Sequence, residues 1–230
     1  AAWQGKSPLG KYGDFVMETD NVATEISAAL EKIGQTDNTL VIFTSDNGAH
    51  WSDADIEHWG HRANGPLAKG KAHPEEGGHR LPFVARWPGV TRAATRTDAT
   101  INHTDFLATL ADLLGVELGK VAPEASKDSH SFLSVLRNPE ATHERTAMAV
   151  TTGSFRQGDW KLTFNRGRRN AGPKEREAGN ASLYQLAKDM GETQDLSASH
   201  PERKQQLFAA YQEYFADRKL KPLAEQVAAR

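Results

Sequence analysis

The sequence lacks cysteine altogether, which excludes disulfide bonds and thiolate metal sites and leaves the redox compartment undetermined. Long apolar runs are also absent. None approaches the roughly 18 residues of a membrane-spanning helix, so we expect no membrane span. Basic residues are not in excess either, since 28 Lys and Arg stand against 30 Asp and Glu. The net charge of −2 argues against a nucleic-acid partner, which needs a basic face.

The 230 residues that are present suffice for a sizeable core, as one large domain or two small ones. Apolar residues at helical spacing over 21–33, closed by Gly34, predict a helix. Further elements follow in alternation, with strands at 39–45, 82–87 and 99–103 and a helix from Thr104 to Gly115. The buried face of that second helix is expected to consist of Phe106, Leu107, Leu110, Leu113 and Leu114. Such alternation is typical of a layered α/β sheet.

Beyond about Glu144 the pattern changes to short strands separated by glycine turns. Strands are predicted at 147–152, 155–164 and 182–186, with turns at Gly153, Gly158 and Gly167. The polar and basic stretch 166–179 is expected to be an exposed loop. Apolar spacing predicts an amphipathic helix over 202–215. The second half of the chain therefore differs in kind from the first.

The most informative motif lies where the strand at 39–45 ends. A short run rich in β-branched and aromatic residues stops abruptly at Asp46-Asn47-Gly48. In open α/β sheets, ligands bind at the carboxyl ends of strands. Asp46 and Asn47 provide two adjacent oxygen ligands suited to a hard cation, and Gly48 lets the chain turn away. These residues predict a metal-dependent active site.

A second motif provides a positive charge. Gly70-Lys71 and Gly77-Gly78 bracket a loop in which the backbone can approach closely, and Lys71 is its mobile point charge. A lysine beside a divalent metal ion can bind a tetrahedral oxyanion such as sulfate or phosphate. Lys69 is a nearby competitor for this role, but the spacing of five residues to Glu76 favours Lys71.

Taken together, these motifs resemble those of the sulfatase family. The series runs from SDNG (45–48) through NGPL (64–67) and GK (70–71) to EGG-x-R-x-P (76–82) and WPG (87–89). Further segments resemble the same family in the same order: GKS with YGD near the start, HTDFLATLADLLG (103–115), DSHSFLSVL (128–136), DWKL (159–162) and SLYQLAKDMGETQDLS (182–197). Each segment alone is a weak indication, whereas their common order is strong.

Parts of the family pattern are missing. Sulfatases carry their nucleophile in a Cys- or Ser-x-Pro-x-Arg motif, converted to formylglycine, together with paired aspartate ligands near the start. This sequence contains no such motif and no paired aspartates at its N-terminus. The resemblance therefore implies the C-terminal portion of a sulfatase, in which the nucleophile lies upstream and this chain alone is inactive.

The resemblance also implies a fold and its division. We expect an α/β class, with 1–143 forming the C-terminal part of a mixed sheet sandwiched by helices. Residues 144–230 would form a small domain with an antiparallel sheet and a terminal helix. The N-terminal half of the same fold would be the chain's partner. By resemblance, the location would be periplasmic or secreted.

The implied site combines these residues. Asp46 and Asn47 would complete a Ca²⁺ site, with Mg²⁺ as an alternative, and formylglycine would stand in the missing half. Lys71 would act in catalysis and contact the sulfate, and His61 and His73 would contact the substrate. The substrate would be a sulfated small molecule or glycan, in the form of an aryl or carbohydrate sulfate ester.

Each proposed site has a simpler competitor. Asp-Asn-Gly is a common turn, and most loop lysines are merely solvated. An EF-hand starting at Asp46 fails, because its sixth position is Trp51 rather than glycine. The close pair His58 and His61 could indicate zinc, but the spacing matches no closed ligand set. Glu76 and Arg80 are interpreted as a structural pair that supports the lysine loop.

Other functions stay open at this point. One is a phosphohydrolase of the same superfamily, although EGG-x-R-x-P and the terminal L-Y-x-L favour the sulfatase. Another is a non-catalytic protein that binds sulfated glycans, for which Arg166, Arg168 and Arg169 could contact the anionic chain. The third is an unrelated calcium-stabilised structural domain. Fold alone does not identify the sulfate ester.

Overall fold

The chain begins with one long helix. The computed structural model describes residues 2–150, 153–164 and 172–217, and α1 spans Gly10–Lys32 within them. The helix predicted at 21–33 is therefore real but starts earlier. Its first turns are fixed by Asp14, whose carboxylate accepts hydrogen bonds from the backbone N–H groups of Gly5, Lys6 and Ser7 at 2.7–2.9 Å. Gly34, with φ of 67°, ends the helix as expected.

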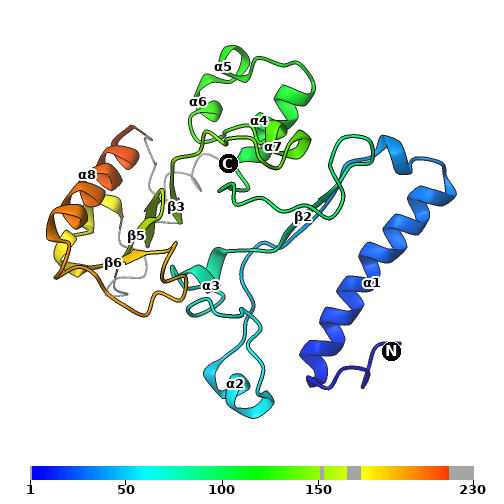
Figure 1. Ribbon diagram of the computed structural model, residues 1–230, viewed down its shortest axis with the longest axis horizontal. Helices are drawn as coiled ribbons and strands as arrows, with labels where there is room; N and C mark the ends of the chain where they lie inside the picture. Colours follow the sequence, from blue (N-terminus) through cyan, green and yellow to red (C-terminus); the bar gives the residue numbers. More distant parts are fainter. Residues whose placement is uncertain (1, 151–152, 165–171, 218–230) are drawn as a thin grey trace, which may run out of the picture.

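A two-stranded ribbon follows the helix and the short 3-10 turn η1 (Thr36–Asn38). Strand β1 (Val41–Thr44) pairs in antiparallel register with β2 (Phe83–Arg86), and Phe43 lies opposite Val84. Both strands are shorter than predicted. Between them the chain forms α2 (Asp53–Trp59) and the single-turn helix α3 (Glu76–His79). Figure 1 shows α3 between the ribbon and the C-terminal sheet.

Four short helices come next: α4 (Asp105–Leu113), α5 (Leu118–Val121), α6 (Pro123–Ser126) and α7 (Leu133–Arg137). The α7 side chains and Phe132 form a buried cluster on which Phe83, Ile101 and Phe106 pack. The predicted strand at 99–103 is wrong. Ile101 does pack inward, but the next backbone N–H, that of Asn102, donates to Asp105 at the start of α4 rather than to a strand.

The buried face predicted for α4 is also wrong in part. Asp105, Thr109 and Ala111 are its buried residues, with Phe106 and Leu113 partly covered. By contrast, the side chains of three predicted core residues are exposed, namely Leu107, Leu110 and Leu114. The reason is that Asp105 turns toward Arg145, whose guanidinium Nε donates to its carboxylate at 2.9 Å. Asp105 and Thr109 therefore face inward together with Phe106 and Leu113, and the opposite side of the helix faces outward.

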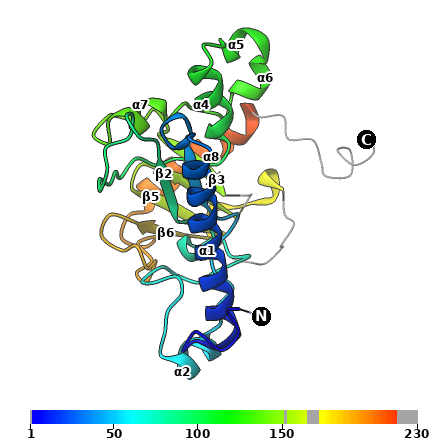
Figure 2. The same cartoon turned by 90° about the vertical axis from the view of Figure 1, so that its right-hand side faces the viewer.

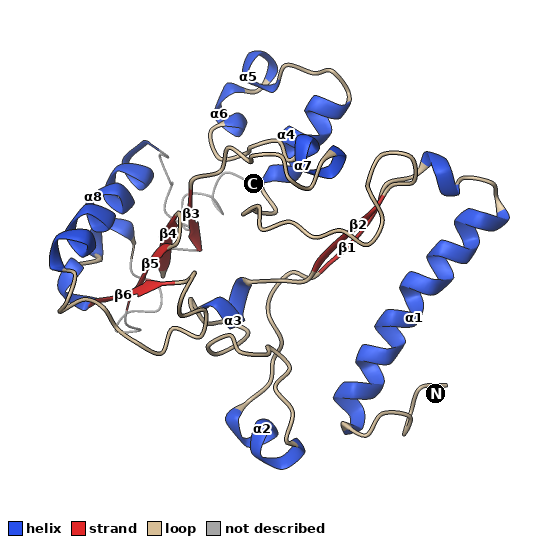
Figure 3. Ribbon diagram, viewed as in Figure 1, coloured by secondary structure: helices blue, strands red, loops and turns tan. Residues whose placement is uncertain are grey.

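The C-terminal part forms a four-stranded antiparallel sheet covered by one helix. The strands are β3 (Ala147–Val150), β4 (Ser154–Gln157), β5 (Trp160–Phe164) and β6 (Ala181–Gln185), in that spatial order. Two 3-10 turns, η2 (Pro173–Glu175) and η3 (Ala178–Asn180), precede β6. Helix α8 (Pro201–Asp217) covers the sheet and confirms the predicted terminal helix. Figure 3 shows the sheet and α8 together, apart from α1.

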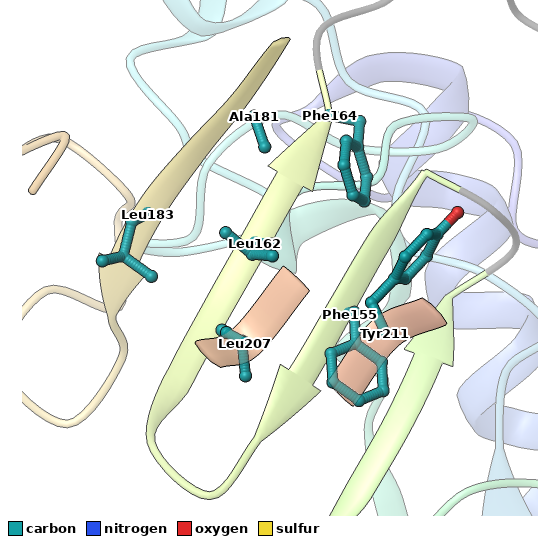
Figure 4. Close-up of a cluster of buried hydrophobic side chains, with 7 residues drawn as sticks. All are labelled: Phe155, Leu162, Phe164, Ala181, Leu183, Leu207 and Tyr211. Carbon is teal, nitrogen blue, oxygen red and sulfur yellow. The ribbon is translucent and has the colours of Figure 1, made fainter. Parts of the chain in front are cut away.

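The main core lies between this sheet and α8. Seven side chains are almost fully buried there: Phe155, Leu162, Phe164, Ala181, Leu183, Leu207 and Tyr211 (Figure 4). Gly158, with φ of 58°, forms the predicted turn between β4 and β5. Gly167 and the three arginines at 166, 168 and 169 lie outside the described residues. A boundary between residues 143 and 144 stays a prediction.

The described elements confirm the α/β class, and every described strand pair is antiparallel. None of the described helices is both long and apolar enough to cross a membrane. In Figure 1 the ribbon stands between α1 and the four-stranded sheet. The lysine loop and the SDNG segment both lie at the end of this ribbon nearest α3.

Candidate functional site

The site begins where β1 ends. After Thr44 the chain bends, and the Ser45 hydroxyl donates to the carbonyl oxygen of Asn47 at 2.9 Å. The Asp46 side chain is exposed and that of Asn47 is half-buried. Within the described residues, neither side chain takes part in a hydrogen bond or an ion pair. Two oxygen-bearing groups thus remain available for a ligand, and oxygen is the donor that Ca²⁺ and Mg²⁺ prefer.

Gly48 brings this segment against the lysine loop. Its backbone N–H donates to the carbonyl oxygen of Gly78 at 2.9 Å. A Cβ atom at Gly48 would overlap the carbonyl oxygen of Gly77, and one at Gly78 would overlap that of His73. The glycines predicted to permit close approach therefore do so, because backbone packs directly on backbone here.

Lys71 is tied to the same segment. Its backbone N–H donates to the carbonyl oxygen of Ala49 at 3.1 Å, and its side chain is exposed. The flanking residues Lys69 and Ala72 have φ of 59° and 68°. This left-handed conformation is unfavourable for residues with a side chain, so the surrounding structure must hold the loop in place. The backbone of Lys71 is therefore held in place. It pairs with Ala49, which lies two residues after Asn47 in the sequence.

Asn64 is a residue that the sequence reasoning missed. Its side-chain oxygen accepts from the N–H of Ala49 at 2.9 Å. Its amide nitrogen donates to the carbonyl oxygens of Ala49 at 3.2 Å and of Lys69 at 3.0 Å. One side chain therefore joins the two segments of the site. The only indication of this role in the sequence was the NGPL motif. It was not specific, because an asparagine before glycine is equally typical of a turn.

The two histidines expected to contact substrate lie in different surroundings. His61 is exposed, its ring centroid is 5.9 Å from that of Trp51, and its carbonyl oxygen accepts from the Trp51 indole at 2.8 Å. Trp51 in turn contacts Tyr12 of α1, with ring centroids 4.9 Å apart. Figure 2 shows α2 beside the N-terminal end of α1. His73 instead belongs to the lysine loop, where its N–H donates to Gly70 at 3.1 Å.

A complete metal site is not formed by the part of the chain that the structure describes. No group of three or more histidine and acidic side chains there is arranged to hold a metal ion. Asp46 and Asn47 could supply two of the roughly six to eight oxygen ligands that Ca²⁺ takes. Any remaining ligands would have to come from other residues.

Glu76 has a different principal partner from the one predicted. The pair with Arg80 exists at 3.5 Å, but the ammonium group of Lys161 lies 2.9 Å from the Glu76 carboxylate. Burial, the largest single influence, would raise the pKa of Glu76, but the charge and hydrogen bond of Lys161 together with the other nearby cationic groups lower it below its usual value. His79, also near Lys161, has its pKa lowered to about 4, by burial first and then by that charge. This buried cluster was not visible in the sequence.

Comparisons with known proteins agree with the motifs. The family model described as Sulfatase matches residues 1–116. An N-acetylgalactosamine-6-O-sulfatase of Bacteroides thetaiotaomicron is 31% identical over 214 residues, covering 86% of this chain and 40% of the relative. A steryl-sulfatase of Rattus norvegicus is 40% identical over 115 residues, covering 50% of this chain and 20% of the relative.

Solved structures show the same fold. A Bacteroides thetaiotaomicron protein, described in connection with the metabolism of multiple glycosaminoglycans, matches with a TM-score of 0.77 at 30% identity. The match covers 92% of this chain and 46% of that one. The PsFucS1 sulfatase from Pseudoalteromonas sp. matches with a TM-score of 0.72 at 24% identity, covering 94% of this chain and 44% of that one, which shows the fold alone.

The family model thus matches half of the chain, and the structural match extends over nearly all of it. The chain spans less than half the length of these relatives. The SDNG segment and the lysine loop, which carry the family's motifs, are joined backbone to backbone. On these grounds the chain belongs to the sulfatase family.

Proposed function

We propose that this chain supplies part of the metal and sulfate site of a sulfuric ester hydrolase that cleaves an aryl or carbohydrate sulfate ester. The observation that carries the proposal is the backbone pairing between Gly48-Ala49 and the loop holding Lys71. The pairing supports the proposal because it brings the backbone of Lys71 against the segment that carries two oxygen donors. Such an arrangement suits a sulfate ester, whose tetrahedral, negatively charged group would bind a metal ion on one side and an ammonium group on the other.

Asp46 and Asn47 are the residues of this chain that would hold the cation. Their donor chemistry fits Ca²⁺ or Mg²⁺, since both side chains offer oxygen and neither is engaged among the described residues. The bound ion would polarise the sulfate oxygens. Gly48 supports both residues, because its close contact with Gly77 and Gly78 fixes the turn on which they lie.

Lys71 would bind the sulfate group and neutralise charge during the reaction. As the sulfur–oxygen bond breaks, negative charge increases on the bridging oxygen, and a nearby ammonium group stabilises it. Because the backbone of the loop is held, little reorganisation is needed at that moment. The nucleophile, a formylglycine, is proposed to come from a segment outside this chain.

The substrate contacts are proposed to come from the histidines. His73 lies in the lysine loop, and His61 lies beside Trp51, which contacts Tyr12 of α1. Aromatic rings beside polar groups suit the apolar and hydroxyl faces of a sugar. The name of the first relative, N-acetylgalactosamine-6-O-sulfatase, points to carbohydrate esters as the first class to test.

An upstream segment of the same fold is the proposed partner. The cross-strand pair Phe43 and Val84 exposes 38% and 60% of its surface. Apolar side chains are exposed on α1 and α4 as well, including Val22, Ile26, Leu107, Leu110 and Leu114. Apolar surface on several neighbouring elements is typical of a face that another part of the protein covers.

The proposal is tested by steady-state kinetics on a full-length protein carrying this chain, with aryl sulfate and aryl phosphate esters side by side. We expect turnover of the sulfate ester and a loss of kcat of about 100-fold or more in Lys71→Gln. The matched control is Lys69→Gln, two residues away on the same loop, which should retain kcat. Preference for the phosphate ester, or an equal effect of both variants, would contradict the proposal.

A further inference from the structure

A buried ionic cluster joins the C-terminal sheet to the lysine loop. The ammonium group of Lys161, on β5, lies 2.9 Å from Glu76 Oε1 and 3.1 Å from Glu192 Oε1. The three side chains are 1%, 2% and 0% exposed. The three residues are far apart in the sequence. Lys161 lies in the DWKL motif, Glu76 in the EGG motif and Glu192 in the segment after β6.

The cluster is completed by neutral and partly exposed groups. The Thr163 hydroxyl donates to Glu192 Oε1 at 3.0 Å, and His79 Nε2 lies 3.1 Å from the Lys161 ammonium group. Arg80 pairs with Glu76 at 3.5 Å from the solvent side. Burial lowers the pKa of Arg156, and the negative charge of Glu76 opposes this shift. Two carboxylates thus share one buried lysine.

Such a cluster is a poor source of stability. Removing charged groups from water costs several kcal/mol per ion, and apolar packing of equal volume stabilises a fold as well or better. What buried charges do provide is one geometry, because each group must meet its partner. Here the geometry that is fixed is that of Glu76, at the start of α3.

Glu76 is connected to Lys71 by a short series of contacts. The Glu76 N–H itself donates to Glu192 Oε2 at 2.6 Å, so both ends of this residue are held from the C-terminal part. The next residue, Gly77, donates to the carbonyl oxygen of Ala68 at 2.8 Å, and its Cβ position overlaps the Lys69 carbonyl oxygen. Helix α3 therefore packs directly against the strained backbone that leads into Lys71.

From this arrangement we infer that Lys161 and Glu192 are positioning residues for Lys71. Through Glu76 and α3, the C-terminal sheet sets where the Lys71 ammonium group lies relative to Asp46 and Asn47. The catalytic consequence rests on the function proposed above. The structural consequence does not, because the order of the loop is measurable without turnover.

The matched control is a second buried ion pair in the same chain. The side chains of Arg145 and Asp105 are fully buried, and Arg145 Nε donates to the Asp105 carboxylate at 2.9 Å. The pair joins the segment before β3 to the start of α4. Within the part of the chain that the structure describes, neither side chain hydrogen-bonds or forms an ion pair with α3 or the lysine loop. Arg145→Met therefore removes a comparable buried charge without touching the inferred connection.

The experiment compares Lys161→Met with Arg145→Met in the full-length protein. Deuterium exchange of residues 68–78 should accelerate about tenfold or more in Lys161→Met and stay unchanged in Arg145→Met. On an aryl sulfate, kcat should fall about tenfold or more in Lys161→Met, since an ångström of misplacement suffices for such losses. KM should change less than kcat. Arg145→Met should lower the thermal midpoint while kcat of the folded protein stays within about threefold.

A second variant guards against a failure of Lys161→Met to fold. Lys161→Gln combined with Glu192→Gln removes one charge of each sign and keeps hydrogen-bonding groups in place. Glu76 then retains Arg80. The same faster exchange and lower kcat are expected.

The two proposals fail in different ways. A wild-type protein without sulfate ester turnover would sink the proposed function, while the exchange rates would still decide the positioning role. Unchanged exchange of residues 68–78 in both Lys161 variants, or equal effects of Lys161→Met and Arg145→Met, would overturn the inference alone.

Discussion

Single residues in this chain hold the candidate site together more than they form it. Asp46, Asn47 and Lys71 would do the chemistry, yet each is largely exposed or half-buried. The groups that hold these residues in position are the Asn64 amide, the glycines of the two segments and the buried charges near α3.

Asn64 is the first of these. Asn64→Ala removes three hydrogen bonds and leaves the N–H of Ala49 and two carbonyl oxygens without this partner. We expect the free energy of unfolding to fall by about 1–3 kcal/mol, the usual effect of leaving buried polar groups unpaired. Urea denaturation of the full-length protein measures this. Asn21→Ala is the control, since that side chain donates to Glu25 on the exposed surface of α1. A loss of the same size in both variants would contradict the role of Asn64.

His79 gives a pH dependence. Burial, followed by the charge of Lys161, lowers the pKa of this imidazole from 6.5 to about 4. As the pH falls through this range, the unfolded chain takes up a proton that the folded chain does not, so the folded state loses stability. The loss should reach roughly 2–3 kcal/mol near pH 4.5.

The check on this prediction is urea denaturation between pH 7.5 and 4.5. His79→Gln cannot titrate, so the difference in unfolding free energy between wild type and variant should shrink or reverse toward the acid end. Parallel curves for the two proteins at every pH would show that His79 does not contribute to this loss.

Among the elements, α3 is a single turn whose backbone is tightly packed on the lysine loop. It consists of Glu76–His79, and its two glycines face carbonyl oxygens of the lysine loop and of His73. Gly77→Ala would force α3 away from the Ala68 and Lys69 carbonyl oxygens of the loop, so we expect a loss of about 1–3 kcal/mol or more in stability and a lower kcat. Gly119→Ala in α5 is the matched control, since its Cβ position meets open space.

The two glycine variants separate crowding from helix propensity. Alanine favours a helix over glycine by about 1 kcal/mol, so Gly119→Ala should be neutral or stabilising. Thermal midpoints of both variants in the full-length protein measure the difference. A Gly77→Ala protein as stable and active as wild type would mean that the backbone packing of α3 on the loop is not required.

Elements with regular local patterns could be predicted from the sequence. The end of β1 just before the SDNG segment, the hairpin turn at Gly158 and the terminal helix α8 all follow from apolar spacing and glycine placement. The early start of α1 could not be predicted, because it depends on Asp14 binding the loop at Gly5 to Ser7. The strand expected at 99–103 failed for a related reason, since a side chain captured the backbone N–H of Asn102.

The candidate site shows the same division. The residue types of Asp46, Asn47 and Lys71 were visible as motifs, although their roles are still proposals. The Lys161–Glu76–Glu192 cluster could not be predicted from the sequence. Its members lie too far apart for a local pattern to connect them, and each belongs to a segment that was interpreted in another way. In the sequence Lys161 is one residue of a predicted strand, and only the fold brings it next to Glu76.

The chain as a whole exposes apolar surface on α1, on the β1–β2 ribbon and on α4. We therefore expect residues 1–230 expressed alone to associate and to bind a hydrophobic dye such as ANS. Size-exclusion chromatography with light scattering measures the association. A monodisperse monomer that melts cooperatively would contradict the proposed upstream partner, whereas a full-length protein should give neither dye binding nor association.

The most direct test of the account is a diffraction measurement on the full-length protein crystallised with Ca²⁺ and inorganic sulfate. The account predicts a cation with oxygen atoms of Asp46 and Asn47 at about 2.3–2.6 Å. It also predicts the Lys71 ammonium group within about 3.2 Å of a sulfate oxygen. A cation bound elsewhere, or Lys71 turned into solvent beside an occupied sulfate site, would contradict the assignment of this segment as the metal and sulfate site.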